Sequence, residues 1–203
     1  MFNRMIQNTR KPEGFLGRMM LRGMNAGHAS LADWGFSFLT IPQGAHVLDV
    51  GCGGGANIAK ILRDMPDSVV DGLDYSDQSV AYSRRTNAAH LGERCTIRQG
   101  DVASLPYPDG SLDLVTAFET VYFWPDLDAA FTEIRRVLKA DGRLFICCEA
   151  DDPSDTTWTD RIEGMTVHRG EDLERRLVDL GFREVQVHRN DRGWMCLTAV
   201  RGI

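Results

Sequence analysis

The sequence predicts a doubly wound α/β fold built on a mostly parallel, seven-stranded sheet. Short β-branched runs alternate with segments of ten or more residues that show helical periodicity, as in βαβ crossovers. Only residues 190–193 separate the last two predicted strands, which predicts a hairpin and therefore one antiparallel strand in the edge region of the sheet. The chain before the first strand is rich in helically spaced apolar residues and predicts an N-terminal helical lid.

The individual elements follow from periodicity in chain order. Residues 15–39 predict two helices, and residues 46–50 predict the first strand. The next helix has one apolar face, formed by Ile58, Ile61, Leu62 and Met65. Further strands are predicted at 69–74, 95–99, 112–118, 144–148, 183–189 and 194–200. Further helices are predicted at 77–91, 127–138 and 173–180.

The length of 203 residues corresponds to roughly one domain. We expect a helical cap in 1–44, a ligand-binding core in 45–150, and a helix with a strand hairpin in 151–203. The content of 43% hydrophobic and 26% charged residues excludes wholesale disorder.

Charge and cysteine content narrow the class of protein. The formal net charge of −6 argues against a protein that grips nucleic acid through backbone electrostatics. No apolar run approaches the ~20 residues of a membrane span, and the five cysteines lack a C-x-x-C spacing. We therefore expect a cytoplasmic protein with no metal, no DNA partner and no membrane span. The basic residues 1–25 fit either a solvated helix face or a contact with an anionic substrate or membrane surface.

A glycine-rich turn, DVGCGGG at 49–55, follows the first predicted strand and precedes a helix. Glycines there let the backbone turn sharply and let a ligand approach closely. Gly51, Gly53 and Ala56 also fit the dinucleotide fingerprint G-x-G-x-x-G/A. However, the carboxylate of Asp49 would be an unfavourable neighbour for a pyrophosphate. A cofactor that carries an α-ammonium and a sulfonium in place of phosphates would tolerate it.

Three acidic residues lie at or just after the ends of three successive predicted strands, namely Asp49, Asp74 and Asp101. The ends of parallel strands share one rim of the sheet, which is where open α/β sheets bind ligands. Asp74 suits a pair of ribose hydroxyls, and Asp101 can accept from an adenine amine beside the backbone amide of Val102. Each acid alone fits a helix N-cap or a turn, but the three together with the glycine turn predict a nucleoside-containing cofactor.

These segments resemble the class I S-adenosylmethionine-dependent methyltransferases, in particular the small-molecule branch that includes the quinone-biosynthesis methyltransferases. The resemblance covers about 45–150 well, and 170–200 only in the order of its elements. One departure is Ala140-Asp141, where the family usually has Pro-Gly. The matching motifs are VLDVGCGGG (47–55), GLDYS (72–76), QGDV (99–102), LPYPDGSLDLV (105–115) and RVLKADGRL (136–144).

The resemblance implies a Rossmann-like fold and S-adenosyl-L-methionine as the cofactor. It places the methionine portion near Asp49, Gly51, Gly53, Asn57, Phe118 and Glu119, although Asn57 also fits a helix cap. It places Asp74 at the ribose. It places the adenine near Tyr75, Asp101 and Val102.

Methyl transfer is an in-line displacement on an activated carbon, so a general base helps only when the acceptor is an oxygen or carbon acid. The candidate bases are His28, Glu119 and Tyr122, followed by His168. Residues 15–40 are expected to form a lid over the cleft. The residues expected to face the acceptor are His28, Trp34, Tyr122 and Trp124. His28 and the aromatic run at 118–125 also fit plain core packing.

The negative charge and the short insertions favour a small-molecule acceptor. Three alternatives remain: a methyltransferase acting on protein or RNA, an NAD-linked oxidoreductase, and a non-catalytic cofactor-binding partner protein. The oxidoreductase alternative leaves Asp49 and Asp101 unexplained. The N-P-P-Y motif typical of DNA adenine methyltransferases is absent from the sequence.

Overall fold

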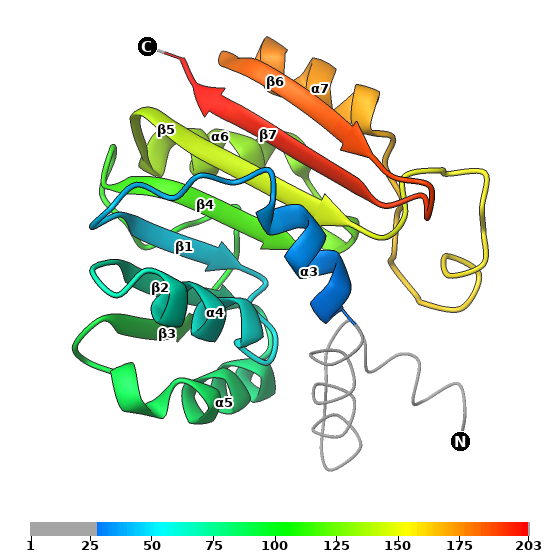
Figure 1. Cartoon of the computed structure of the whole chain (residues 1–203). Coiled ribbons are helices and arrows are strands. Elements are labelled where there is room, and N and C mark those ends of the chain that lie inside the picture. The colour runs from blue at the N-terminus through cyan, green and yellow to red at the C-terminus, as the bar shows by residue number, and fades with distance from the viewer. Residues whose placement is uncertain (1–27, 203) are drawn as a thin grey trace.

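The computed structural model describes residues 28–202, so residues 15–27 of the expected lid lie outside the described part of the chain. A seven-stranded sheet in the order β3-β2-β1-β4-β5-β7-β6 forms the centre of the molecule (Figure 1). Only β7 runs antiparallel to its neighbours, β5 and β6. This topology confirms the predicted doubly wound fold. The strands are β1 (His46–Val50), β2 (Val69–Asp74), β3 (Cys95–Gln99), β4 (Leu112–Phe118), β5 (Leu138–Cys148), β6 (Phe182–Arg189) and β7 (Met195–Arg201).

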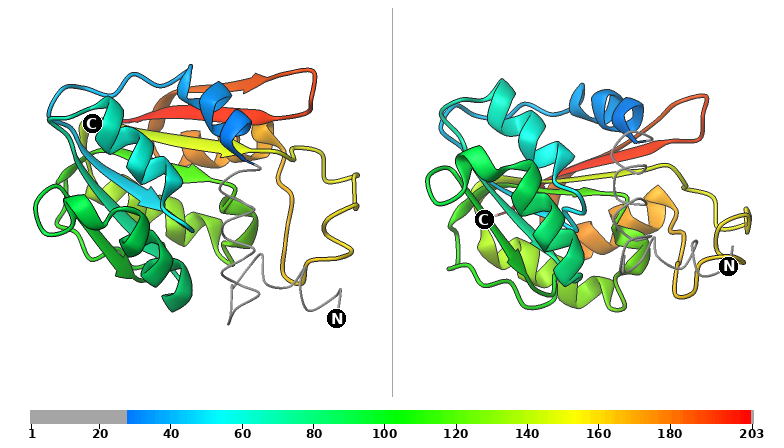
Figure 2. Two further views of the ribbon diagram at one scale, coloured as in Figure 1. Left: turned by 60° about the horizontal axis from the view of Figure 1, so that its bottom comes forward. Right: turned by 90° about the horizontal axis from the view of Figure 1, so that it is seen from below.

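Helices cover both faces of the sheet (Figure 2). The helices are α3 (Ala29–Phe36), α4 (Ala56–Asp64), α5 (Asp77–Thr86), α6 (Leu127–Val137) and α7 (Gly170–Asp179), with short 3-10 turns η1 (Ala88–His90) and η2 (Val121–Phe123). Successive residues of β1 serve opposite faces: Val47 packs in one core cluster with α3 and α4, and Leu48 packs in the other with α6 and α7. The sheet is therefore buried on both sides, as its continuous apolar strands require.

Two boundaries differ from the prediction by five residues or more. Helix α5 ends at Thr86 and not at residue 91, because Asn87 turns its side chain inward and donates to the carbonyl oxygens of Gly55 and Ser83. Strand β5 begins six residues before the predicted Leu144, where Leu138 pairs with Leu112 ahead of a register shift.

Helix α3 lies unusually close to β5. A Cβ added at Gly35 would stand 2.7 Å from the Sγ atom of Cys147, so only glycine permits this approach. Leu31, in the same helix, is buried against the sheet. The close packing holds His28, at the start of the helix, above the carboxyl ends of the central strands.

The outer strand β6 is irregular. Its pairing with β7 shifts register between Arg183 and Gln186, and Glu184 takes a left-handed backbone conformation with φ 52°. Arg183 forms ion pairs with Asp141 and Glu184. Within residues 28–202, no helix combines the length and apolar character needed to cross a membrane.

Candidate functional site

A pocket of about 570 Å³ opens at the carboxyl ends of β1, β2 and β4. The helices after β1 and β2 lie on one face of the sheet and the helix after β4 lies on the other, so the pocket occupies the topological switch point. The predicted residues that line it are His28, Gly51, Gly53, Asn57, Asp74, Tyr75, Asp101, Val102, Phe118, Glu119 and Trp124.

The floor of the pocket is the glycine turn. Gly51, Gly53 and Gly55 all have positive φ angles, of 68°, 50° and 76°, which side-chain-bearing residues rarely adopt. A Cβ at Gly51 would also overlap the hydroxyl of Thr120, in the segment that follows β4. The turn therefore packs directly against residues 118–120, and a ligand above it meets backbone without intervening side chains.

Asp74 fixes the shape of this turn from the end of β2. Its carboxylate accepts hydrogen bonds from the backbone N–H groups of Gly53 and Ser76, each at 2.8 Å. Burial raises the pKa of Asp74, and these two N–H groups oppose that shift. The same carboxylate faces the pocket, where it can accept from neighbouring hydroxyls.

The far rim of the pocket carries more exposed groups. Tyr75 is 68% exposed and extends beside the pocket. Asp101 is also exposed, and one of its oxygens accepts from the N–H of Ala103 at 2.9 Å. Val102 is buried behind it. This arrangement provides an open edge suited to a flat, polar ring.

Asp49 lies beneath the turn and outside the pocket lining. It is 2% exposed and accepts a hydrogen bond of 2.7 Å from the hydroxyl of Thr116, its register partner on β4. Burial raises its pKa to about 7, the Thr116 bond opposes this, and the nearby Asp74 adds to it. The Asp49 side chain is therefore bonded to β4 and lies deeper than the pocket surface where the resemblance places it.

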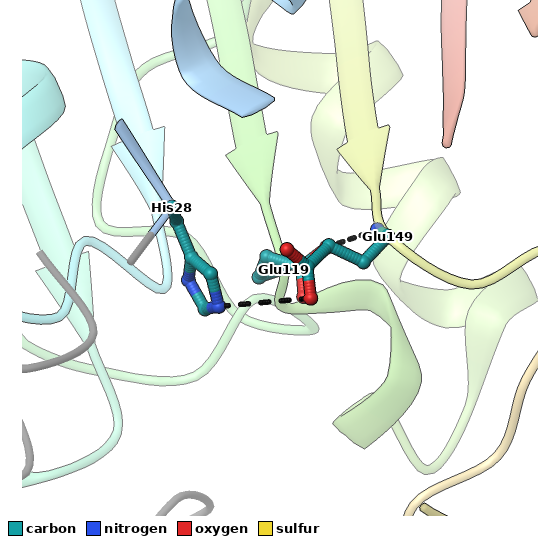
Figure 3. Close-up of side chains that lie close together, drawn as sticks. All are labelled: His28, Glu119 and Glu149. Carbon is teal, nitrogen blue, oxygen red and sulfur yellow. Dashed lines mark hydrogen bonds and ion pairs between the residues drawn. The ribbon is translucent and has the colours of Figure 1, made fainter. Parts of the chain in front are cut away.

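Three titratable side chains meet at the other end of the pocket (Figure 3). They are His28 at the start of α3, Glu119 after β4 and Glu149 after β5, and their ligand-type atoms all lie within 4.8 Å of one another. His28 Nε2 is 4.0 Å from Glu149 Oε2. Glu119 Oε1 accepts from the N–H of Glu149 at 2.5 Å and from the hydroxyl of Tyr122 at 3.3 Å.

Burial sets the protonation of this cluster. It raises the pKa of Glu119 to about 8; the N–H of Glu149 opposes the shift, and the charge of Glu149 adds to it. Burial also lowers the pKa of His28, which the Glu149 carboxylate opposes. Near neutral pH the cluster therefore contains a neutral imidazole and a largely protonated Glu119.

Sequence reasoning missed Glu149. The available signal was positional: β4 and β5 are adjacent parallel strands, with Phe118 paired to Cys147, so the residues just after both strands meet at one rim. The predicted end of this strand at Cys148 already implied that Glu149 lies at the same rim as Glu119.

Three other predicted residues lie outside the pocket lining. Tyr122 is buried, and its hydroxyl accepts from the N–H of Ala150 at 2.8 Å. Trp34 packs against Phe38 and Trp194, with ring centroids at 5.2 and 6.1 Å. His168 is also not part of the lining, whereas Trp124 lines the pocket and packs its ring against Phe131.

Comparison with known proteins decides the family. Residues 48–146 match the family model for a methyltransferase domain. The chain carries a methyltransferase domain. This domain is similar to the fatty-acid O-methyltransferase of Mycolicibacterium smegmatis, with 35% identity over 101 residues, 49% of this chain and 35% of that protein. It is also similar to the demethylmenaquinone methyltransferase of Symbiobacterium thermophilum, with 37% identity over 112 residues, 54% of this chain and 44% of that protein.

The fold of the methyltransferase domain is shared with solved structures. A SAM dependent methyltransferase from Aquifex aeolicus superimposes with a TM-score of 0.75 and 18% identity, covering 90% of this chain and 97% of that one. These matches confirm the predicted class I methyltransferase fold, and S-adenosyl-L-methionine is the cofactor of this domain. The matched segment spans less than half of the length of each curated relative described above.

Proposed function

We propose that this protein transfers a methyl group from S-adenosyl-L-methionine to an oxygen atom of a small, largely apolar acceptor. One observation carries the proposal: a single pocket joins the acid-lined cofactor rim to a compartment with aromatic walls and a neutral histidine. The walls of that compartment are Ala29, Ala32, Phe118, Phe123 and Trp124. The curated relatives named above, a fatty-acid O-methyltransferase and a demethylmenaquinone methyltransferase, support an apolar acceptor.

The residues present fit the cofactor. Gly51 and Gly53 line the pocket with backbone alone, and a Cβ at Gly53 would project into open space, with no atom closer than 4.0 Å. Asp74 lines the same pocket. Asp74 would bind the ribose hydroxyls, and Asp101 with Val102 would hold the adenine at the open rim. When bound, the cofactor supplies a methyl group already activated by its sulfonium, so positioning and exclusion of water dominate the task of the protein.

His28 is the general base of the proposed reaction. Its imidazole is neutral because burial lowers its pKa, so Nε2 can accept the proton of an acceptor hydroxyl. Glu149, 4.0 Å away, then stabilises the imidazolium that forms. Phe123 and Trp124 restrict the access of water to this end of the pocket.

Cofactor choice is the first test. S-adenosylhomocysteine should bind with a micromolar dissociation constant in isothermal titration calorimetry, and NAD should show no comparable binding. Incubation with methyl-labelled S-adenosylmethionine and a metabolite extract should then yield a labelled small apolar product. Tight binding of NAD without binding of S-adenosylhomocysteine would contradict the proposal.

His28→Gln tests the base. Turnover of the acceptor found in the labelling screen should fall roughly 10²- to 10⁴-fold, because the proton acceptor is lost. The dissociation constant of S-adenosylhomocysteine should stay nearly the same. In the wild type, kcat/KM should rise with pH through the lowered pKa of His28 and level off above it, and the variant should lack this rise. Wild-type turnover in His28→Gln would exclude this role.

A further inference from the structure

Glu119 lies at the acceptor end of the pocket, in the segment after β4 that packs against the glycine turn. It lines the pocket together with Gly51 and Phe118, and its neighbour Thr120 abuts Gly51 so closely that a Cβ there would overlap it. A ligand that lies across the glycine turn therefore comes within reach of the Glu119 carboxyl group.

Within residues 28–202, the groups that face the Glu119 carboxyl include no cation. Those groups are Glu149 after β5, Tyr122 in η2, His28 at the start of α3, and the thiols of Cys147 and Cys148 in β5. None of them carries a permanent positive charge. A cation brought into the pocket would supply the partner that this buried carboxylate needs.

We propose that Glu119 distinguishes the positively charged methyl donor from its neutral product. Its carboxylate pairs with a cation in the pocket, and a neutral ligand in the same position binds less tightly. This inference rests on the proposed function and deepens it. It assigns Glu119 a role in donor specificity, separate from the proton transfer assigned to His28. Conversion of the sulfonium to a thioether removes this interaction and thereby favours release of the product.

The pairing of Glu119 with a cation is coupled to the release of a proton from its carboxyl group. Burial raises the pKa of Glu119 to about 8, so the carboxyl is mostly protonated at pH 7 in the absence of a cation. A bound cation favours the carboxylate form, so the carboxylic acid of Glu119 releases its proton to the solvent when the cation binds. A neutral ligand has no such effect. Affinity for a cationic ligand should therefore rise with pH up to about 8, relative to affinity for a neutral ligand, and level off above it.

Two cofactor analogues allow the binding of a cationic ligand to be compared with that of a neutral one without requiring turnover. S-adenosylhomocysteine has an uncharged thioether where the donor has its sulfonium, and in sinefungin a protonated amine occupies the position of the sulfonium methyl. Calorimetry in buffers of different ionisation enthalpy should detect release of up to about one proton near pH 7 when sinefungin binds, beyond that seen with S-adenosylhomocysteine. The preference of the wild type for sinefungin over S-adenosylhomocysteine should grow about tenfold between pH 6.5 and pH 8.

Glu119→Gln should remove both effects while it retains the shape of the side chain. Its preference for sinefungin should be about tenfold weaker than that of the wild type at pH 8 and should change little with pH. Glu93→Gln, at an exposed acid outside the pocket, is the control and should behave as the wild type. Because proton release is measured on the wild type itself, the test does not depend on the folding of the variant.

The possible failures are distinguishable. If wild type binds both analogues without extra proton release for sinefungin, or if Glu119→Gln keeps the wild-type preference, the role of Glu119 is wrong and the proposed function stands. If the wild type binds neither analogue, the proposed function itself fails.

Discussion

Asp74→Ala should weaken the binding of S-adenosylhomocysteine by roughly ten- to a hundredfold. The Asp74 carboxylate faces the pocket from the end of β2, where it can accept from both ribose hydroxyls. Hydrogen bonds to a charged group contribute about 1.5–3 kcal/mol each, and about 1.4 kcal/mol corresponds to a factor of ten in affinity. Isothermal titration calorimetry measures this change directly.

The same variant should also melt at a lower temperature, because Asp74 accepts from the N–H groups of Gly53 and Ser76. Asp74→Asn separates the two roles, since its amide oxygen keeps one acceptor for the turn while the charge is removed. Asp77→Ala, at an exposed acid in the first turn of α5, is the matched control and should bind as the wild type does. An unchanged dissociation constant in Asp74→Ala would show that Asp74 acts only in the turn.

Asp49→Asn should stabilise the protein, and more so at alkaline pH. The buried Asp49 has its pKa raised from 3.8 to about 7, so the native state retains a proton that the unfolded chain has lost. Its contribution to stability is complete below its ordinary pKa and is lost as the pH rises through about 7. Asparagine does not titrate, keeps an oxygen for the Thr116 hydroxyl and avoids this loss.

The gain in the free energy of unfolding should be about 2–3 kcal/mol larger at pH 8 than at pH 5, which is ~5–10 °C in Tm. Thermal unfolding followed by circular dichroism at both pH values measures it. Asp113→Asn on β4 is the control, because Asp113 forms an ion pair with Lys139 at 2.8 Å and its loss should give no such gain. A Tm for Asp49→Asn that does not rise relative to wild type between the two pH values would contradict the buried, protonated state.

The cofactor end of the site could be predicted from the sequence because its determinants are local. Gly51 and Gly53 must be glycine for conformational reasons, and Asp74 and Asp101 lie at the ends of strands that are neighbours in the sheet. The depth of Asp49 was not predictable in the same way. It depends on the pairing of Asp49 with Thr116, which lies 67 residues later in the chain.

The acceptor end was less predictable because its geometry comes from distant contacts. Trp34 is of a residue type that often binds flat ligands, yet its ring packs against Trp194 in the hairpin between β6 and β7. Glu149 approaches His28 because Gly35 lets α3 settle on β5. A helical period places residues on one face of a helix, but it does not identify the strand that the helix will meet.

The irregular strand β6 determines how the molecule behaves toward copies of itself. An exposed edge strand offers unpaired N–H and C=O groups that can template sheet growth and aggregation. Here the left-handed Glu184 and the register shift interrupt any straight row of such groups, and the charged Arg183 and Arg189 flank the interruption. These features disfavour the in-register addition of a second chain along β6, and so protect this side of the sheet against edge-to-edge fibril growth.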